Sequence, residues 1–156
     1  MIKDTVEFEL TDLTEKDTER LGNRLSARLK GGEFIALFGD LGAGKTTLTR
    51  AIAKGLGIES VQSPTFTIVR EHRGKTLELL HFDAYRLSDE DELYAIGYDD
   101  YLARTSVIIM EWCDNVLGAL PDERLEIHIV GSGAQARTMQ FIAIGKKYAE
   151  LIGGLK

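Results

Sequence analysis

The sequence predicts an α/β fold, a three-layer sandwich whose mixed, mostly parallel central sheet is extended by antiparallel strands. Residues 34–38 (FIALF) are apolar throughout, as is typical of a strand covered on both faces, and a glycine-rich loop and a helical pattern follow them. Residues 107–110 (VIIM) form a second apolar run of this kind. Residues 69–82 have the pattern of a hairpin, which adds an antiparallel pair and makes the sheet mixed.

The N-terminal part of the chain predicts an edge strand and then a helix. Residues 5–10 alternate apolar and charged side chains, which indicates a half-buried strand near the edge of the sheet. Thr14 and Asp17 form the capping-box pattern that begins a helix, and Gly31 and Gly32 are expected to end it. The helix should bury its leucines, Leu21, Leu25 and Leu29. A row of arginines on the same helix is expected to be solvated, with a phosphate-rich partner as the alternative: Arg20, Arg24 and Arg28.

The middle of the chain predicts two helices on either side of the hairpin. A helix is expected over residues 45–56, since apolar side chains recur along one side of it. Pro64 favours an extended loop that leads into the hairpin, whose tip should lie near residues 73–74. Residues 88–96 predict a short helix with Ser88 as its cap.

The C-terminal part predicts two more strands and a helical tail. Residues 125–130 and 139–144 are alternating or apolar and should extend the sheet. The tail, residues 145–156, has an apolar helical stripe that is expected to dock on its own domain, with a contact to a partner's groove as the alternative. The stripe consists of Tyr148, Leu151, Ile152 and Leu155.

Composition predicts one globular domain over residues 1–156 in the cytoplasm. The chain is 44% hydrophobic, which suits a packed core, and its net charge of −6 argues against unaided binding to nucleic acid. Cys113 is the single cysteine, so no intramolecular disulfide can form, as suits a reducing compartment. No apolar run approaches the ~20 residues that cross a bilayer, and we expect neither a signal peptide nor a membrane contact.

The loop GDLGAGKTT has the spacing of a phosphate-binding loop. Its glycines permit backbone angles and close approach that a Cβ would block, so that main-chain N–H groups at a helix N-terminus surround phosphate oxygens. Lys45 would reach the β- and γ-phosphates of ATP, and the Thr46 hydroxyl would bind a Mg²⁺ ion that bridges them. The nucleotide-binding residues expected are Gly39, Asp40, Leu41, Gly42, Ala43, Gly44, Lys45, Thr46 and Thr47.

Phosphoryl transfer also needs a second metal anchor and a group that orients the nucleophile. Glu111 directly follows VIIM, and Asp83 follows the second strand of the hairpin, so either carboxylate fits a magnesium ligand; a surface carboxylate is the alternative for each. Thr65 lies in the irregular stretch before the hairpin and could approach the γ-phosphate, although spacing alone favours a local turn contact. Trp112 could shield the nucleotide, with a core position as the alternative.

The succession of motifs resembles the bacterial TsaE family, the P-loop ATPases of tRNA threonylcarbamoyladenosine biosynthesis. The motifs extend from about Thr14 to Val130, and no single one beyond the phosphate loop is decisive. In order they are GDLGAGKTT, SPTFTIV, HFDAYRL, DELYAIGYDDYL, IIMEW and LPDERLEIHI. Ala84 stands where many relatives have a larger apolar residue, and the region after Gly131 matches no family feature.

The resemblance implies roles for individual residues. Family members bind ATP and Mg²⁺ and hydrolyse ATP weakly by themselves. Thr46 and Glu111 would then be magnesium ligands, and Asp83 would lie in or near the metal shell and be needed for turnover, together with Lys45. Thr65 would belong to a switch-like segment, and Trp112 matches the tryptophan that follows the family's acidic residue.

The resemblance also implies partners. Family members act with the TsaD- and TsaB-type proteins of the threonylcarbamoyl-transferase complex, so contact with tRNA would be indirect and the ATPase would do regulatory work in the complex. Two other functions use the same loop: a small-molecule kinase, which would need an arginine-rich lid that is not obvious here, and a non-catalytic nucleotide-sensing assembly module.

Overall fold

The computed structural model describes residues 5–40, 42–61, 64 and 67–155. Its elements in chain order are β1 (Thr5–Leu13), α1 (Glu15–Ser26), β2 (Phe34–Phe38), α2 (Lys45–Gly55), β3 (Val69–Arg73), β4 (Glu78–Asp83), α3 (Glu90–Ala95), α4 (Tyr98–Leu102), β5 (Val107–Glu111), the 3₁₀ helix η1 (Cys113–Ala119), β6 (Arg124–Val130), β7 (Arg137–Ile144) and α5 (Lys146–Gly153).

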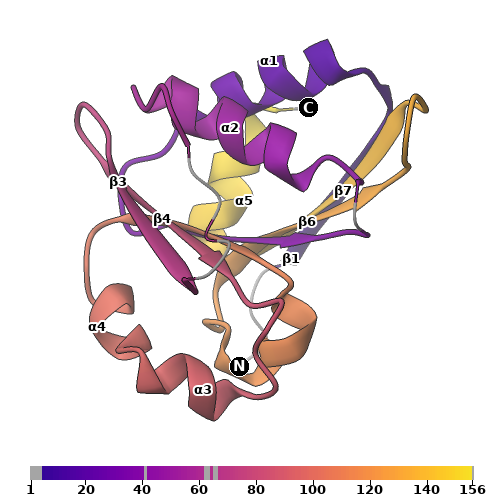
Figure 1. Ribbon diagram of the computed structural model, residues 1–156. Helices are drawn as coiled ribbons and strands as arrows, with labels where there is room; N and C mark the ends of the chain where they lie inside the picture. The colour runs from indigo at the N-terminus through magenta and orange to yellow at the C-terminus, as the bar shows by residue number, and fades with distance from the viewer. Residues whose placement is uncertain (1–4, 41, 62–63, 65–66, 156) are drawn as a thin grey trace.

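The described strands form one sheet of seven strands in the order β1-β7-β6-β2-β5-β4-β3. The four central strands, β6, β2, β5 and β4, are parallel to one another. At one edge β3 pairs antiparallel with β4, and at the other edge β7 pairs antiparallel with both β6 and β1. Helices α1, α2 and α5 cover one face, and α3, α4 and η1 lie on the other (Figure 1). The predicted three-layer architecture with a mixed sheet is therefore confirmed.

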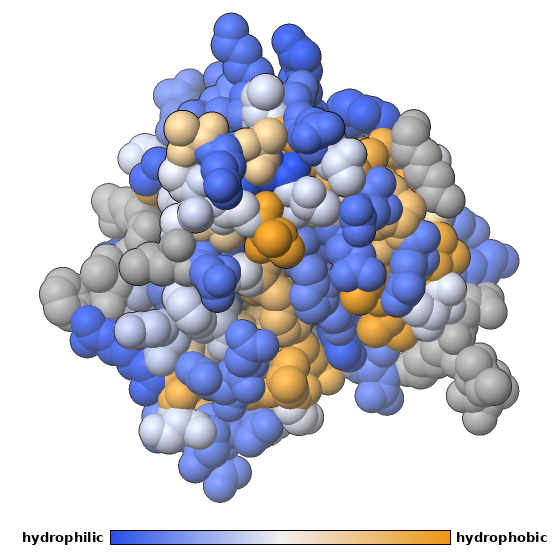
Figure 2. Space-filling model, turned by 90° about the vertical axis from the view of Figure 1, so that its right-hand side faces the viewer, coloured by the Kyte–Doolittle hydropathy of each residue, from blue (hydrophilic) through white to orange (hydrophobic). Residues whose placement is uncertain are grey.

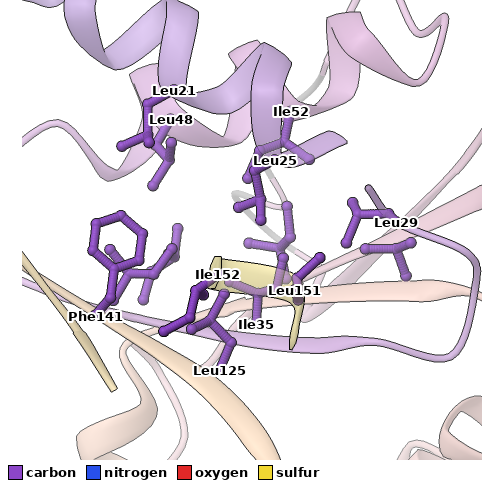
Figure 3. Packing of buried hydrophobic residues seen from close by; sticks show 14 of the residues in the cluster. Leu21, Leu25, Leu29, Ile35, Leu48, Ile52, Leu125, Phe141, Leu151 and Ile152 are labelled. Atoms are coloured by element: carbon purple, nitrogen blue, oxygen red, sulfur yellow. The ribbon is translucent and has the colours of Figure 1, made fainter. Parts of the chain in front are cut away.

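Both faces of the sheet carry a buried apolar core. On one face, leucine and isoleucine side chains from α1, α2 and α5 meet the side chains of β2, β6 and β7 (Figure 3). The central strand β2 contributes to both faces, with Ile35 and Leu37 in this core and Phe34 and Ala36 in the other. Since β2 is the strand that leads into the glycine-rich loop, that loop starts from the most enclosed part of the sheet.

Helices α1 and α2 pack against each other closely enough to require a glycine. A Cβ on Gly22 would lie 2.4 Å from the Cβ of Ala51 and 3.1 Å from its main-chain carbon. The apolar stripes of the two helices then point together toward the sheet, through Leu21 and Leu25 on α1 and through Ile52 on α2 (Figure 3).

The C-terminal tail docks on its own chain, as the sequence predicts. Its apolar stripe is buried against the sheet, and the Tyr148 hydroxyl accepts a hydrogen bond of 2.8 Å from the N–H of Phe34 at the start of β2. Arg24 of α1 and Arg28, which follows the helix, are not simply solvated, because they donate to main-chain carbonyls at the end of α5: those of Gly154, Glu150 and Leu151. Cations at this end of a helix also interact favourably with its dipole.

Several predicted element boundaries are wrong. Helix α1 ends at Ser26 rather than at the glycines, because the carboxylate of Glu33 accepts hydrogen bonds from the N–H groups of Lys30 and Gly31 and holds them in a turn. Helix α3 is capped by Asp89, whose side chain accepts from the N–H of Glu92, and not by Ser88. Helices α4 and η1 are short elements that the sequence analysis did not predict.

The predicted edge strand, the capping box at Thr14 and Asp17 and the hairpin are confirmed. None of the helices in the described ranges is long and apolar enough to cross a bilayer.

Candidate functional site

Residues 39–47, which we call the phosphate loop, lead from the end of β2 into the first turn of α2. Gly42 and Gly44 have φ angles of +82° and +108°, which side chains other than glycine rarely adopt, and Gly44 is the N-terminal cap of α2. The N–H of Ala43 donates to the carbonyl of Asp40 and closes a turn within the loop. Leu41 lies outside the described residues.

Lys45 is the first residue of α2 and its side chain turns back under the loop. It is buried, and its Nζ donates to the carbonyl of Gly39 at the other end of the loop. The same Nζ lies 4.0 Å from the centroid of the Trp112 ring, within range of a cation–π contact. A buried ammonium group is therefore held between a carbonyl and an aromatic face, at the position where the sequence predicts a phosphate ligand.

The two predicted carboxylates lie side by side at the carboxyl end of the parallel strands. Asp83 is the last residue of β4 and pairs in register with Glu111, the last residue of β5, and Glu111 in turn pairs with Leu37 of β2. The phosphate loop leaves β2 within two residues of Leu37, so all three strands bring their ends to one place. This is the edge at which parallel α/β sheets place their ligand sites.

Glu111 is buried and paired with a histidine, a residue that is not among those predicted to form the site. His81 of β4 donates from Nε2 to Oε2 of Glu111 at 2.6 Å, and its side chain is 2% exposed. His81 sits two residues before Asp83, so both side chains point to the same side of β4. Among the described residues Nδ1 of His81 has no hydrogen-bond partner, so the hydrogen bond that the imidazole forms there is the one from Nε2 to the carboxylate.

The surroundings of Asp83 disfavour its charged form. Burial raises the pKa of this carboxyl above its ordinary value, and the nearby negative charge of Glu111 raises it further, while the N–H of Tyr85, which donates to Oδ1 at 2.9 Å, acts in the opposite direction. Lys45 and His81 also favour the charged form, by smaller amounts. A cation beside the two carboxylates would relieve the repulsion between them.

Trp112 forms one wall of the site. It follows Glu111 with a φ of +59°, which is unusual for a bulky residue and turns the chain from β5 into η1. The ring is half-buried, between Lys45 and the exposed ring of Tyr85, whose centroid is 4.9 Å away. Asn115 of η1 holds the Tyr85 segment by donating to the carbonyls of Ala84 and Tyr85.

A hollow of about 290 Å³ lies next to the other side of the phosphate loop. It is lined by the loop residues Gly44 and Thr47, by the start of α1 and by residues 133–137, which connect β6 to β7. Thr46 is exposed in the first turn of α2. Thr65 lies outside the described residues, so its predicted approach to the phosphates stays a prediction.

Arg137, at the start of β7, also contacts the phosphate loop. Its guanidinium donates to the carbonyls of Ala43 and Gly42, at 2.8 and 3.2 Å. This contact was not predicted, because nothing in the spacing relates β7 to a loop about 90 residues earlier. The contact of His81 with Glu111 was not predicted either, although the alternation along HFD in β4 was an available signal.

The residues present fit a magnesium ion. Thr46, Asp83 and Glu111 offer only oxygen donors, which hard cations prefer. Among the described residues there is no group of three or more His, Cys, Asp and Glu side chains that could hold a metal ion. Mg²⁺ is commonly bound through one or two carboxylates together with the phosphates of its nucleotide, so a sparse set of this kind suits it.

The side of the molecule on which the phosphate loop and the β6–β7 turn lie in Figure 1 faces the viewer in Figure 2. Hydrophilic residues cover most of this face, and a column of apolar surface runs between them down its middle.

Comparisons with known proteins identify relatives over most of the chain. The family model described as threonylcarbamoyl adenosine biosynthesis protein TsaE matches residues 13–139. A tRNA threonylcarbamoyladenosine biosynthesis protein TsaE of Bacillus subtilis is 42% identical over 137 residues, which are 87% of this chain and 85% of that protein. The protein of the same name from Streptomyces coelicolor is also 42% identical, over 83% of this chain and 92% of its own length.

A solved structure has the same fold. The crystal structure of Bacillus subtilis YdiB superposes with a TM-score of 0.80 at 33% sequence identity, and the match covers 99% of this chain and 96% of that one.

Proposed function

Because the chain belongs to the TsaE family of threonylcarbamoyl adenosine biosynthesis proteins, we propose that it supports the threonylcarbamoyl modification of tRNA as a Mg²⁺-dependent ATPase. The relatives are named after this tRNA modification, and their similarity supports a role of the chain in the same pathway. The phosphate loop and the charged side chains beside it support ATP as the ligand.

One observation carries the ATPase proposal: the buried ammonium group of Lys45 and the paired carboxylates of Asp83 and Glu111 meet at the end of the parallel strands, beside the phosphate loop. Lys45 would exchange its contact with the Gly39 carbonyl for the β- and γ-phosphates, and the loop N–H groups would surround them. The nucleoside part of ATP would extend past Thr47 into the adjoining hollow. Trp112 would cover the phosphates from the opposite side.

Thr46 and Glu111 are the proposed ligands of Mg²⁺, with Asp83 in or near the same shell. When bound, the ion would supply positive charge that neutralises the negative charge developing on the phosphates. His81 holds Oε2 of Glu111, which leaves Oε1 as the oxygen free of that hydrogen bond. Asp83, whose pKa is raised by burial, would orient the attacking water or accept its proton.

We propose that ATP acts by changing the affinity for partner proteins. The partners would be the TsaD- and TsaB-type proteins of the transferase complex, and tRNA would be reached through them, since a chain of net charge −6 is poorly suited to hold nucleic acid alone. Bound ATP would favour one arrangement of the segments around Thr65 and Asp83, and hydrolysis would remove those contacts. The setting would be the cytoplasm, whose reducing conditions suit the single thiol of Cys113.

Lys45→Ala tests the proposal, with Lys54→Ala as the matched control, because Lys54 is an exposed lysine in the last turn of the same helix. Calorimetry with ATP and Mg²⁺ should show binding to the wild type and to Lys54→Ala. Loss of a charge-assisted phosphate contact should weaken binding to Lys45→Ala by roughly a hundredfold. In reconstituted threonylcarbamoyl transfer to tRNA with the partner proteins, Lys45→Ala should fail to support repeated cycles.

Calorimetry, product analysis and a Glu111→Ala variant separate the proposal from its rivals. A wild type that released no heat with millimolar ATP and Mg²⁺ would end it. A phosphorylated small molecule in place of free phosphate would indicate a kinase. Unchanged phosphate release by Glu111→Ala that binds ATP normally would indicate a non-catalytic nucleotide sensor.

A further inference from the structure

The guanidinium of Arg137 joins the phosphate loop to the turn between β6 and β7. Its Nε donates to the carbonyl of Ala43 at 2.8 Å, and its Nη2 donates to the carbonyl of Gly42 at 3.2 Å. Nη2 also donates to the carbonyl of Gly133 at 3.1 Å, and Nη1 donates to that of Gln135. One side chain therefore holds two carbonyls of the loop and two of the turn.

These contacts fix the direction of a main-chain donor in the loop. In a trans peptide group the carbonyl and the amide point in opposite directions, and the described residues contain no cis peptide bond. Because the carbonyl of Ala43 points to Arg137, the N–H of Gly44 in the same peptide group points away from it. Gly44 caps α2, so this N–H is one of the helix-terminal donors that have no partner within the helix.

Arg137 also adds a positive charge beside the loop. Its hydrogen-bond partners in the described part of the chain are main-chain carbonyls, and no described carboxylate forms an ion pair with it. A guanidinium remains protonated in proteins, so its charge adds to the positive end of the α2 dipole.

The turn is shaped to admit this side chain. Gly131, which follows β6 with a φ of +128°, is so close to Arg137 that a Cβ on it would lie 2.9 Å from the arginine Cδ. Only a residue without a side chain leaves room for the arginine at its present position.

We propose that Arg137 is a positioning residue for nucleotide binding: it clamps the carbonyls of Gly42 and Ala43 so that the N–H of Gly44 faces the phosphates, and it makes the order of the loop depend on the β6–β7 turn. The proposal rests on ATP as the ligand of the phosphate loop. It does not require Arg137 to touch the nucleotide.

Arg137→Lys and Arg137→Met test the clamp, with Arg20→Met as the control for loss of a charge at an exposed arginine. Lysine keeps the charge but carries its donors on one nitrogen, so it cannot reach all four carbonyls as the three guanidinium nitrogens do. Calorimetry with ADP at a temperature at which every variant is folded should show dissociation constants about tenfold or more above the wild-type value for both Arg137 variants. Arg20→Met should match the wild type.

Hydrogen exchange without nucleotide gives a second, independent measurement. In Arg137→Met, the amides of residues 39–47 and of residues 131–137 should exchange faster together, with little change in β2 and β5. Full recovery of ADP affinity in Arg137→Lys would show that charge alone matters and would overturn the clamp. Faster exchange confined to residues 131–137 would overturn it as well. If the wild type bound no nucleotide, the proposed function would fail, and the exchange measurement would still decide whether the clamp orders the loop.

Discussion

At the scale of the single residue, the site holds a carboxylate whose folded surroundings oppose its charge. Asp83 lies next to Glu111 and is half-buried, and burial is the larger cause of its raised pKa. The folded chain therefore binds the Asp83 proton more tightly than the unfolded chain does. The stability of the fold then falls as the pH rises from the ordinary pKa of 3.8 through the raised one, so the charged group is a cost at neutral pH.

Asp83→Asn should raise the melting temperature at pH 7 while it lowers ATP hydrolysis. Asparagine keeps an acceptor for the N–H of Tyr85 and carries no charge. The gain in melting temperature should shrink as the pH falls toward the ordinary pKa of 3.8, because protonation then removes the charge of wild-type Asp83 as well, and thermal scans across this range measure it. ATP turnover should fall about tenfold or more, because proton transfer or water orientation is lost.

The control is Glu59→Gln, which removes one exposed negative charge outside the helices and strands. An equal rise in melting temperature in that variant would mean that the effect comes from the net charge of the chain and not from the site. A gain for Asp83→Asn that stayed the same at pH 4 would also contradict the explanation.

The position of a residue in the candidate site was predictable from sequence where the residue belongs to a short local motif. Lys45 follows from the loop spacing, and Asp83 and Glu111 follow from their positions after apolar strands, which the register then placed side by side. His81 and Arg137 were not predicted as parts of the site, because their contacts join residues 30 and 94 positions apart and no short pattern contains them.

At the scale of the element, the approach of α1 to α2 sets the position of the phosphate loop, because α2 starts at the loop. The two helices approach at Gly22, where a Cβ would lie 2.4 Å from that of Ala51. The apolar periodicity of each helix was readable in the sequence, but the close approach was not, since it depends on which residue of one helix meets which residue of the other.

Gly22→Ala should therefore destabilise the chain even though alanine favours helices. The overlap with Ala51 should cost about 1–3 kcal/mol in the free energy of unfolding, measured by denaturant titration. Gly153→Ala is the control: Gly153 is also helical, and a Cβ there would meet nothing within 4 Å, so stability should stay the same or rise. Equal effects of the two substitutions would contradict the packing argument.

Element ends were predicted less well than element types. The expected stop of α1 at Gly31 is wrong because the carboxylate of Glu33 accepts from the N–H groups of Lys30 and Gly31 and holds them in a separate turn after the helix. Arg24 and Arg28 were expected to be solvated, but they donate to carbonyls at the end of α5, far along the sequence. In each case a contact outside the predicted motif overrides its signal.

At the scale of the whole molecule, the thiol of Cys113 can report whether the folded chain unfolds. Cys113 is fully buried under the sheet, and its Sγ donates weakly to the carbonyl of Met110 at 3.2 Å. Burial raises the pKa of this thiol well above its ordinary value, so it is protonated and inert in the folded chain.

Cys113 should react with a thiol reagent only when the molecule unfolds. Its labelling rate under native conditions should be roughly a thousandfold or more below the rate in denaturant, and the reaction with an aromatic disulfide measures both. Ser60→Cys places a second thiol at an exposed position and should react quickly in the folded chain, while Cys113 does not. Fast labelling of Cys113 in the native wild type would show that η1 opens independently of the sheet.

The layers of the molecule were predictable from sequence and the order of its strands was not. Apolar runs and the hairpin indicate a mixed sheet between helices, because they report what each strand faces. The insertion of β7 between β1 and β6 has no local signature, since strand order depends on pairings between distant segments.

That strand order has a consequence for biosynthesis. β1 precedes β7 along the chain, and among the described strands β7 is its one pairing partner, so Thr5 cannot pair with Ile144 until β7 has been translated. Until then the apolar residues of β1 have no strand to pair with and stay available to other chains. A nascent polypeptide stalled before residue 137 would therefore expose a strand with a strong tendency to associate.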